Sequence, residues 1–340
     1  MAMKYLKIGL TLILTALLLL FFFKNVEFAR VIQFIKQVNP VYPLLFAAGS
    51  FAQFFIRGYR WGIILKPHKP NISLFALYEF TLVGYFINMF LPGRLGEPAK
   101  GILIARRESF PPSHGLASVV WERLIDVFML VFFFLVSLAF IPEPVPGFLT
   151  RLKKISFIAF PVLIMLFVFL YFLSSPRLAS VVGKWITRIM KVLPKKIRSK
   201  AQSATIKFIE GLRLNLSFAD FVKLFIASIA VWGSLIPCYW ILMKGFGIEA
   251  TLLETLPYFS IIAVAAAVPT PGMAGSIDAA SKLALVELFD VPVNTAAAYT
   301  ILFHFLVLAL WSVFGLIAFV RQGLNMTTIK KVTGKKNEMP

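Results

Sequence analysis

The sequence predicts an all-α, polytopic transmembrane helical bundle, and composition and hydropathy are the main reasons. Hydrophobic residues fill 59% of the 340 positions, whereas apolar residues make up roughly 45–50% of soluble domains. The mean hydropathy is +0.84, and several apolar runs approach the roughly 20 residues that cross a bilayer as a helix. The short alternating segments typical of a transmembrane β-barrel do not occur. We therefore expect one transmembrane domain over residues 1–340.

Six apolar runs are long enough to cross the bilayer once each. They cover residues 6–23, 41–56, 116–140, 155–173, 219–243 and 296–320. The first run has a basic start, as a signal peptide does, but no small-residue cleavage site follows it, which favours a retained helix. The single cysteine, Cys238, lies in the fifth run, where we expect it to act as a small buried hydrophobic residue.

Two further apolar stretches end in a Pro-Gly pair instead of an ordinary loop. Residues 74–91 lead into the first pair and residues 255–268 into the second, and a shorter helix of mixed polarity follows each. Irregular backbone at membrane depth is tolerated where it is buried in protein or lines a wet cavity. We therefore expect two re-entrant helical hairpins. Their tips are predicted at Asn88, Pro92, Gly93, Gly96, Pro271, Gly272 and Gly275.

The two hairpins have a similar layout along the chain. A second proline follows each break, at Pro112 and Pro292, and a long apolar helix comes next. We predict an inverted repeat, with repeat one at about 74–140 and repeat two at about 255–320. Inverted repeats are typical of secondary transporters, whose substrate sites form where broken helices meet.

Positive charge predicts the orientation in a cell (plasma) membrane. The net charge is +20, and the segment 174–218 alone carries ten Lys and Arg residues. By the positive-inside rule this loop is cytoplasmic, as are both termini and a loop expected to carry Arg57 and Arg60. Residues 178–193 have an amphipathic pattern that predicts an interfacial helix. The basic surplus favours anionic lipid head groups as partners over nucleic acid, because no basic soluble domain is present.

Ionisable residues cluster at the predicted membrane depth. Each costs on the order of 2.5–3.5 kcal/mol to insert, so they are expected to face a cavity or one another. The candidate binding residues are Arg94, Glu97, Lys100, Glu122, Arg123, Asp126, Asp278, Lys282 and His304. Glu122 and Asp126 are four residues apart and share a helix face. We predict a polar chamber for an anionic group, in which the forked donors of Arg94 and Arg123 suit a phosphate.

Two alternatives to this binding site stay open. Arg94 with Glu97, and Arg123 with Asp126, can form ion pairs that only lock the hairpin. The second alternative is catalysis, but the sequence has no nucleophile motif, nucleotide-binding loop or metal-ligand pattern. No cofactor or metal is therefore predicted, and a transporter is favoured over an enzyme.

The motifs around these charges resemble a known family. The stretches "NMFLPGRLGEPAKGILIARR" and "GLASVVWERLIDVFML" are similar to the signature of the lysylphosphatidylglycerol synthase transmembrane-region family. The matching positions are Asn88, Pro92, Arg94, Gly96, Glu97, Glu122, Arg123 and Asp126, followed later by Pro271, Gly272 and Gly275. The chain departs from the family at Asp278, where a glutamate is usual nearby, and at His304, near the place of a common arginine.

The resemblance implies a flippase-like protein without the soluble aminoacyl-transfer domain of the full-length synthases. Members are linked to moving aminoacylated phospholipids or polyprenyl-phosphate sugars between leaflets. We therefore predict a flippase-like transporter of an anionic lipid, phosphate- or polyprenyl-phosphate-linked. The alternatives are a membrane enzyme with Glu97 or Glu122 as base, and a non-catalytic partner of a glycosyltransferase or synthase.

Overall fold

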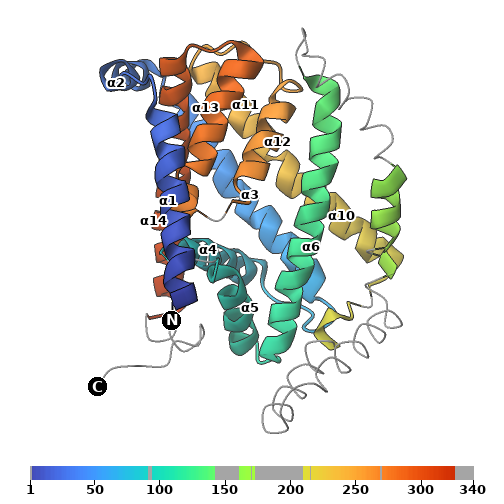
Figure 1. Ribbon diagram of the computed structural model, residues 1–340. Coiled ribbons are helices and arrows are strands. Elements are labelled where there is room, and N and C mark those ends of the chain that lie inside the picture. Colours follow the sequence, from blue (N-terminus) through green and yellow to red (C-terminus); the bar gives the residue numbers. More distant parts are fainter. Residues whose placement is uncertain are drawn as a thin grey trace, which may run out of the picture.

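The computed structural model describes residues 2–90, 94–141, 161–169, 171–172, 210–214, 216–268 and 270–325. Every regular element in these ranges is a helix (Figure 1), which confirms the predicted all-α bundle. Within the described part of the chain, three helical stretches are long and apolar enough to cross a membrane, namely Pro112–Phe140, Phe218–Gly245 and Val293–Arg321. The protein is therefore an integral membrane protein with helical spans.

Long helices form the frame of the bundle (Figure 1). They are α1 (Ala2–Phe23), α3 (Val41–Leu65), α6 (Pro112–Ser137), α14 (Val293–Arg321) and the continuous stretch of α10 (Phe218–Gly233) and α11 (Leu235–Gly245). The 3₁₀ turn η1 (Leu138–Phe140) extends α6, and Ser234 separates α10 from α11. The short amphipathic helix α2 (Phe28–Gln37) lies crosswise at one end of the bundle. Residues 161–169 are also helical, inside the predicted crossing 155–173.

The third helix corrects one expectation. Arg57 and Arg60 do not lie in a loop, because α3 continues to Leu65 and carries both of them. Apolar residues resume directly after Arg60, and Trp61 and Ile64 are both 0% exposed. The sequence interpretation ended this crossing at the first arginine, whereas the helix continues and buries Arg60 against carboxylates of a neighbouring helix.

Two pairs of short helices fill the centre of the bundle. The first is α4 (Leu74–Phe90) with α5 (Gly96–Arg107), and the second is α12 (Thr255–Ala265) with η3 (Pro271–Met273) and α13 (Ser276–Phe289). The four α-helices have 11 to 17 residues, or roughly 16 to 26 Å at 1.5 Å per residue, which is shorter than the roughly 30 Å hydrocarbon core. Figure 1 shows α4 and α5 in the lower half and α12 and α13 in the upper half. Entry from opposite leaflets, and the inverted repeat, remain predictions.

The breaks within the pairs depend on close backbone contact and on left-handed residues. Pro92 and Gly93, two of the predicted tips, lie outside the described residues. Next to them, Asn88 accepts a hydrogen bond from the backbone N–H of Gly96 at 2.7 Å, and a Cβ at Gly96 would lie 1.9 Å from the carbonyl oxygen of Gly84. In the second break, Gly272 and Gly275 have φ of +58° and +82°, which side chains rarely adopt.

Polar contacts join several helices at the end of the bundle where α1 begins and α14 ends. Arg321 at the end of α14 pairs with Glu79 of α4 at 2.9 Å. Lys66, just after α3, pairs with Asp220 near the start of α10 at 3.1 Å. His68 bonds to the Gly211 carbonyl at 2.9 Å. We call this region the basic end, because its described cations include Lys66, Lys69, Arg106, Arg107 and Arg321.

The basic segment 174–218 is connected to the basic end on both sides. The ring of Tyr171 lies 5.8 Å from that of Phe218 and 5.1 Å from that of Phe221. Residues 171 and 172 and the start of α10 therefore lie at the same end. The predicted interfacial helix 178–193 lies outside the described residues.

Candidate functional site

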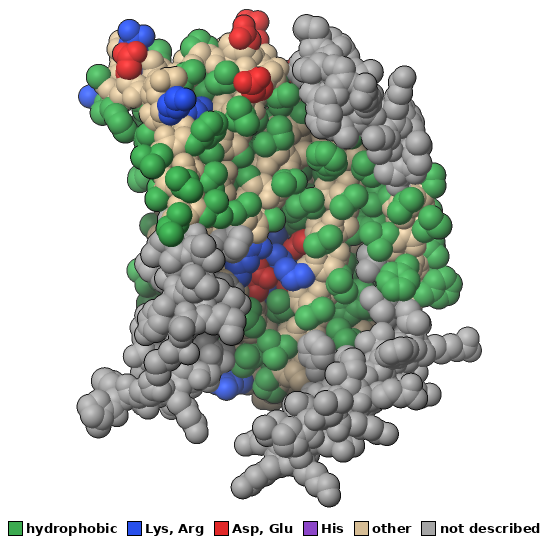
Figure 2. Space-filling model, in the orientation of Figure 1, with side chains coloured by type: hydrophobic (Ala, Val, Ile, Leu, Met, Phe, Trp, Pro, Cys, Tyr) green, Lys and Arg blue, Asp and Glu red, His purple; other side chains and the backbone are tan. Residues whose placement is uncertain are grey.

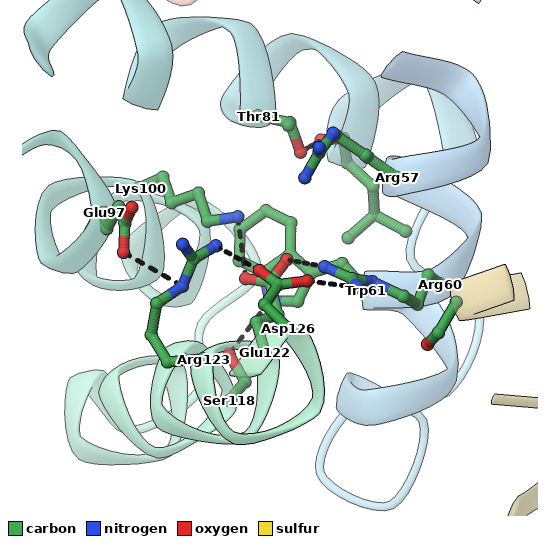
Figure 3. Close-up of polar contacts among 12 residues, drawn as sticks. Arg57, Arg60, Trp61, Thr81, Glu97, Lys100, Ser118, Glu122, Arg123 and Asp126 are labelled. Carbon is green, nitrogen blue, oxygen red and sulfur yellow. Dashed lines mark hydrogen bonds and ion pairs between the residues drawn. The ribbon is translucent and has the colours of Figure 1, made fainter. Parts of the chain in front are cut away.

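A cluster of six charged side chains lies between α3, α5 and α6, and we call it the ion cluster (Figure 3). Its members are Arg60 from α3, Glu97 and Lys100 from α5, and Glu122, Arg123 and Asp126 from α6. Three cations face three carboxylates, so the ion cluster is neutral as a unit. Neutrality matters here because unpaired charge at membrane depth is costly.

Glycines bring the α5 and α6 parts of the ion cluster close together. A Cβ at Gly115 of α6 would lie 2.0 Å from the carbonyl oxygen of Gly101 of α5, a distance that real Cβ atoms essentially never show. The two backbones therefore touch one residue after Lys100. This contact places the base of Lys100 beside α6, from which Glu122 reaches its ammonium.

The deepest pairs of the ion cluster are formed by Arg60 and Lys100. The Nη1 of Arg60 lies 2.6 Å from Oδ1 of Asp126, and its Nη2 lies 3.6 Å from Oε1 of Glu122. Lys100 Nζ lies 2.7 Å from the other carboxylate oxygen of Glu122. Arg60 is 0% exposed and Glu122 is 2% exposed, so these pairs are shielded from water and lipid.

Arg123 joins the deep part of the ion cluster to its surface. Its Nε lies 3.1 Å from Glu97 and its Nη2 lies 2.7 Å from Asp126. The expected Arg123–Asp126 pair is therefore present, whereas Glu97 pairs with Arg123 and not with Arg94. The side chain of Arg123 is 38% exposed, which makes it accessible from outside the bundle.

Aromatic side chains line the inner wall of the ion cluster. Lys100 Nζ lies 4.4 Å from the ring centroid of Trp61, a cation–π distance. The indole N–H of Trp61 donates to Ser118 at 2.9 Å, and that of Trp232 donates to Asp126 at 3.1 Å. These donors satisfy polar atoms that would be costly to bury alone.

A small hollow lies beside the ion cluster, with a cavity volume of about 10 Å³. It is lined by Arg57, Thr81, Gly84, Tyr85, Asn88, Glu97, Lys100, Glu122 and Arg123. Figure 2 shows basic and acidic side chains gathered in a recess halfway along a face that is otherwise mostly hydrophobic. A molecule at this face can therefore touch apolar surface and charged groups at the same time.

Two arginines near the hollow are left without a carboxylate partner. Arg57 donates to Gln53 at 3.3 Å and lies 5.6 Å from the ring centroid of Tyr85. Arg94, with a left-handed φ of 54°, donates to the backbone carbonyl of Ala266, at the end of α12. Neither forms an ion pair with any described carboxylate. Because the ion cluster is neutral, these two arginines give the region a surplus of positive charge.

The other three predicted site residues lie in a second polar cluster. Asp278 of α13 lies 2.7 Å from Nδ1 of His304 of α14, and its second oxygen accepts the backbone N–H of Gly275 at 2.8 Å. Lys282 donates to backbone carbonyls at the end of α1, including that of Phe21 at 2.9 Å. These residues hold the second break and α1 in place. Their role in binding a substrate stays a prediction.

The sequence interpretation did not include Arg57 or Arg60 in the site. One signal for them was available, since Glu97, Glu122 and Asp126 are three predicted intramembrane carboxylates that need cations. Arg57 and Arg60 are three residues apart and therefore lie near each other on one side of a helix. The partners of Arg60 come from α6, more than 60 residues away, so only the packing of α3 on α6 identifies it. Arg57 contacts Gln53 of its own helix and the ring of Tyr85 on α4.

Comparison with known proteins places the chain in a family. A family model described as the lysylphosphatidylglycerol synthase TM region matches residues 7–315. A UPF0104 membrane protein of Methanocaldococcus jannaschii is 22% identical over 351 aligned positions, which cover 99% of each chain. The resemblance inferred from the motifs at Asn88–Asp126 is therefore confirmed. The chain belongs to the lysylphosphatidylglycerol synthase transmembrane-region family.

Proposed function

We propose that the protein is a flippase-like transporter that moves an anionic lipid between leaflets. The phosphate of the head group binds in the hollow beside the ion cluster, and the acyl or polyprenyl chains stay in the bilayer. The observation that carries this proposal is the surplus positive charge of Arg57, which lines a hollow in an apolar face, and of Arg94, three residues before the lining residue Glu97. A phosphate compensates that surplus, whereas a neutral head group leaves it uncompensated.

The chemistry of the lining favours a phosphate. Arginine offers forked donors that match phosphate oxygens, and two arginines can bind one phosphate from two sides. Arg57 and Arg123 both line the hollow, and the side chain of Arg123 is partly exposed. Tyr85 and Asn88 add neutral polar groups for the rest of the head group.

The position of the hollow favours a lipid over a soluble anion. It opens in a face whose surroundings are mostly hydrophobic (Figure 2), and α6 next to it exposes apolar residues such as Val127, 62% exposed. A membrane solute reaches such an opening from the side without leaving the bilayer. Arg94 also bonds to the carbonyl of Ala266, so the two helix breaks can move together when a head group attracts Arg94.

The charge distribution supports cytoplasmic termini. The basic end holds the connections that carry Lys66, Lys69, Arg106 and Arg107, and both ends of the 174–218 segment with its ten cations. The opposite end has carboxylates on its connections, including Glu249, Glu254 and Asp290. By the positive-inside rule the basic end faces the cytoplasm.

Lipid exchange in proteoliposomes tests this function. A fluorescent phosphatidylglycerol and a matched phosphatidylcholine are placed in both leaflets, and an impermeant reductant reports how fast the inner pool becomes accessible. We expect the protein to accelerate exposure of the anionic probe more than that of the neutral one. Equal rates for the two probes, or no acceleration over empty vesicles, would contradict the proposal.

The variant Arg57→Gln tests the assigned site. A hydrogen bond to a charged group contributes about 1.5–3 kcal/mol, so its loss is expected to slow exchange of the anionic probe by roughly 10- to 100-fold. Folding should be unaffected, because Arg57 takes no part in the ion cluster. The matched control is Arg30→Gln on α2, whose side chain is 62% exposed. Unchanged exchange in Arg57→Gln, with the control also unchanged, would remove the site assignment.

A further inference from the structure

Hydrogen-bond geometry shows which atoms carry hydrogens in the cluster of Asp278, His304 and the second helix break. Nε2 of His304 lies 3.0 Å from the carbonyl oxygen of Gly272. A carbonyl only accepts, so Nε2 must carry a hydrogen. Asp278 Oδ2 already accepts the N–H of Gly275, so the contact to His304 is made by Oδ1.

The 2.7 Å contact between Nδ1 of His304 and Oδ1 of Asp278 requires one more hydrogen. Either Nδ1 is protonated and the carboxylate is ionised, or the acid is protonated and Nδ1 accepts. Both forms have the same number of protons and a net charge of zero. The arrangement therefore contains one exchangeable proton, shared by His304 and Asp278.

Loss of this proton breaks one of the two hydrogen bonds of His304. With Nε2 still protonated, a lone pair on Nδ1 faces a carboxylate oxygen, and the contact becomes repulsive. If the ring moves its hydrogen to Nδ1, the bond to Gly272 is lost instead. Deprotonation also leaves a net negative charge on a pair whose members are 6% and 7% exposed, which is costly in a membrane.

The backbone held by this pair is in a left-handed conformation at three positions. Gly272, Met273 and Gly275 have φ of +58°, +61° and +82°, and a left-handed conformation is uncommon for a residue such as Met273. His304 forms a hydrogen bond to the break at Gly272, and Asp278 forms one at Gly275. When one of these hydrogen bonds is lost, the break is free to rearrange.

The same break is connected to the hollow through Arg94. The guanidinium of Arg94 donates to Ala266, the residue directly after α12 and at the start of the break. A rearrangement between Ala266 and Gly275 therefore changes whether Arg94 is held by the protein or is available to a phosphate. The exchangeable proton and the anion site are joined by one short stretch of backbone.

Other titratable groups near the pair are already engaged. Lys282 of α13 donates to the carbonyls of Phe21, Phe22 and Lys24. On α12 the titratable group is Tyr258, which bonds to Ser281 at 2.8 Å. The remaining titratable groups on α1, α4, α13 and α14 are Lys4, Tyr5, Lys7, Tyr78, Glu79, Tyr85, Glu287, Tyr299 and Arg321.

We propose that the proton shared by His304 and Asp278 is the coupling ion of transport. This inference rests on the proposed function. The protonated pair closes the second break and keeps Arg94 on Ala266, and release of the proton opens the break and frees Arg94 for the anionic head group. Each transport cycle then binds and releases one proton at this pair.

The variant Asp278→Asn is the sharpest test because it preserves the geometry and removes the proton site. The introduced amide oxygen can accept from Gly275, and the amide N–H can donate to Nδ1 of His304, which still donates to Gly272. We expect this variant to fold with the thermal stability of the wild type. In proteoliposomes with a pH gradient, the wild type should enrich fluorescent phosphatidylglycerol in one leaflet, and a protonophore should abolish the enrichment.

For Asp278→Asn we expect the same lipid distribution with and without the gradient. A gradient-driven enrichment in this variant would overturn the proposal. If the wild type exchanges the anionic probe but ignores the gradient, proton coupling fails while the proposed transport function survives. If the wild type exchanges no anionic probe, the proposed function itself fails, and coupling fails with it.

A labelling measurement tests the switch independently of transport. Ala274, half-exposed in the break, is replaced by cysteine in a Cys238→Ala background, and its reaction with a thiol reagent is followed against pH. Every thiol reacts faster at high pH, so the same variant with Asp278→Asn supplies the reference curve. We divide the labelling rate of the protein with Asp278 by that of the Asp278→Asn variant, and we expect this ratio to rise several-fold as pH increases. A ratio that does not change with pH would overturn the switch.

Discussion

The buried arginine of α3 allows a quantitative test of the ion cluster. Replacing Arg60 by methionine keeps most of its volume and removes one of three cations, leaving two cations against three carboxylates. Arg60 is 0% exposed and lies 2.6 Å from Asp126. Breaking a buried pair by removing one partner costs about 3–5 kcal/mol. Asp126 keeps Arg123 at 2.7 Å, so we expect a loss near the lower end of that range.

A second substitution separates lost charge balance from lost packing. In Arg60→Met with Asp126→Asn, Lys100 keeps Glu122 and Arg123 keeps Glu97, so the ion cluster is neutral again. The double variant should therefore be more stable than Arg60→Met alone by about 1 kcal/mol or more, because contacting residues couple by 0.5–3 kcal/mol.

Unfolding in mixed micelles, followed by tryptophan fluorescence, measures both effects. The signal suits this region, because Trp61 and Trp232 contact members of the ion cluster. The control is Arg30→Met, whose exposed pair with Glu27 should contribute at most about 1 kcal/mol. A role of the ion cluster in stability is contradicted if Arg60→Met has a free energy of unfolding within about 1 kcal/mol of the wild type, or if Asp126→Asn destabilises Arg60→Met further.

Two further variants test the packing and the basic end. Gly115→Ala places a Cβ 2.0 Å from the carbonyl oxygen of Gly101, so we expect overpacking to lower the free energy of unfolding by about 1–3 kcal/mol. The control is Gly233→Ala, whose Cβ would have its nearest neighbour 3.8 Å away. It should leave the free energy of unfolding unchanged in the same assay. Burial, and then the neighbouring His114, lower the pKa of His68 below 6.5, so the unfolded chain binds the proton more readily and stability should fall as pH drops below about 6.5. The variant His68→Gln should flatten that dependence between pH 7.5 and 5.5, and an unchanged slope would count against the assignment.

Much of the fold follows from the sequence because hydropathy and helix breakers are local signals. The long apolar runs predicted the spanning helices, and the breaks after residues 90 and 265 occur near the predicted positions. The end of α3 was the exception. An arginine near the end of an apolar run usually marks the membrane surface, and only the carboxylates of α6 explain why Arg60 is buried instead.

The candidate site was only partly predictable, for a similar reason. The i to i+3 and i to i+4 spacings place Glu122, Arg123 and Asp126 near one another, and the observed Arg123–Asp126 pair follows from that spacing. The division of the predicted residues into two clusters does not follow from it. That division depends on which helix faces which, and the sequence pattern does not specify whether His304 faces Arg94 or Asp278.

Photo-crosslinking from the hollow is the most direct test of the central claim, that an anionic lipid head group binds there. Benzoylphenylalanine is placed at position 85 in place of Tyr85, which lines the hollow, and for comparison at position 127 in place of the lipid-facing Val127. The protein is irradiated in native membranes, and the attached lipids are identified by mass spectrometry. We predict that anionic lipids are enriched at position 85 relative to position 127. The same lipid mixture at both positions would contradict it.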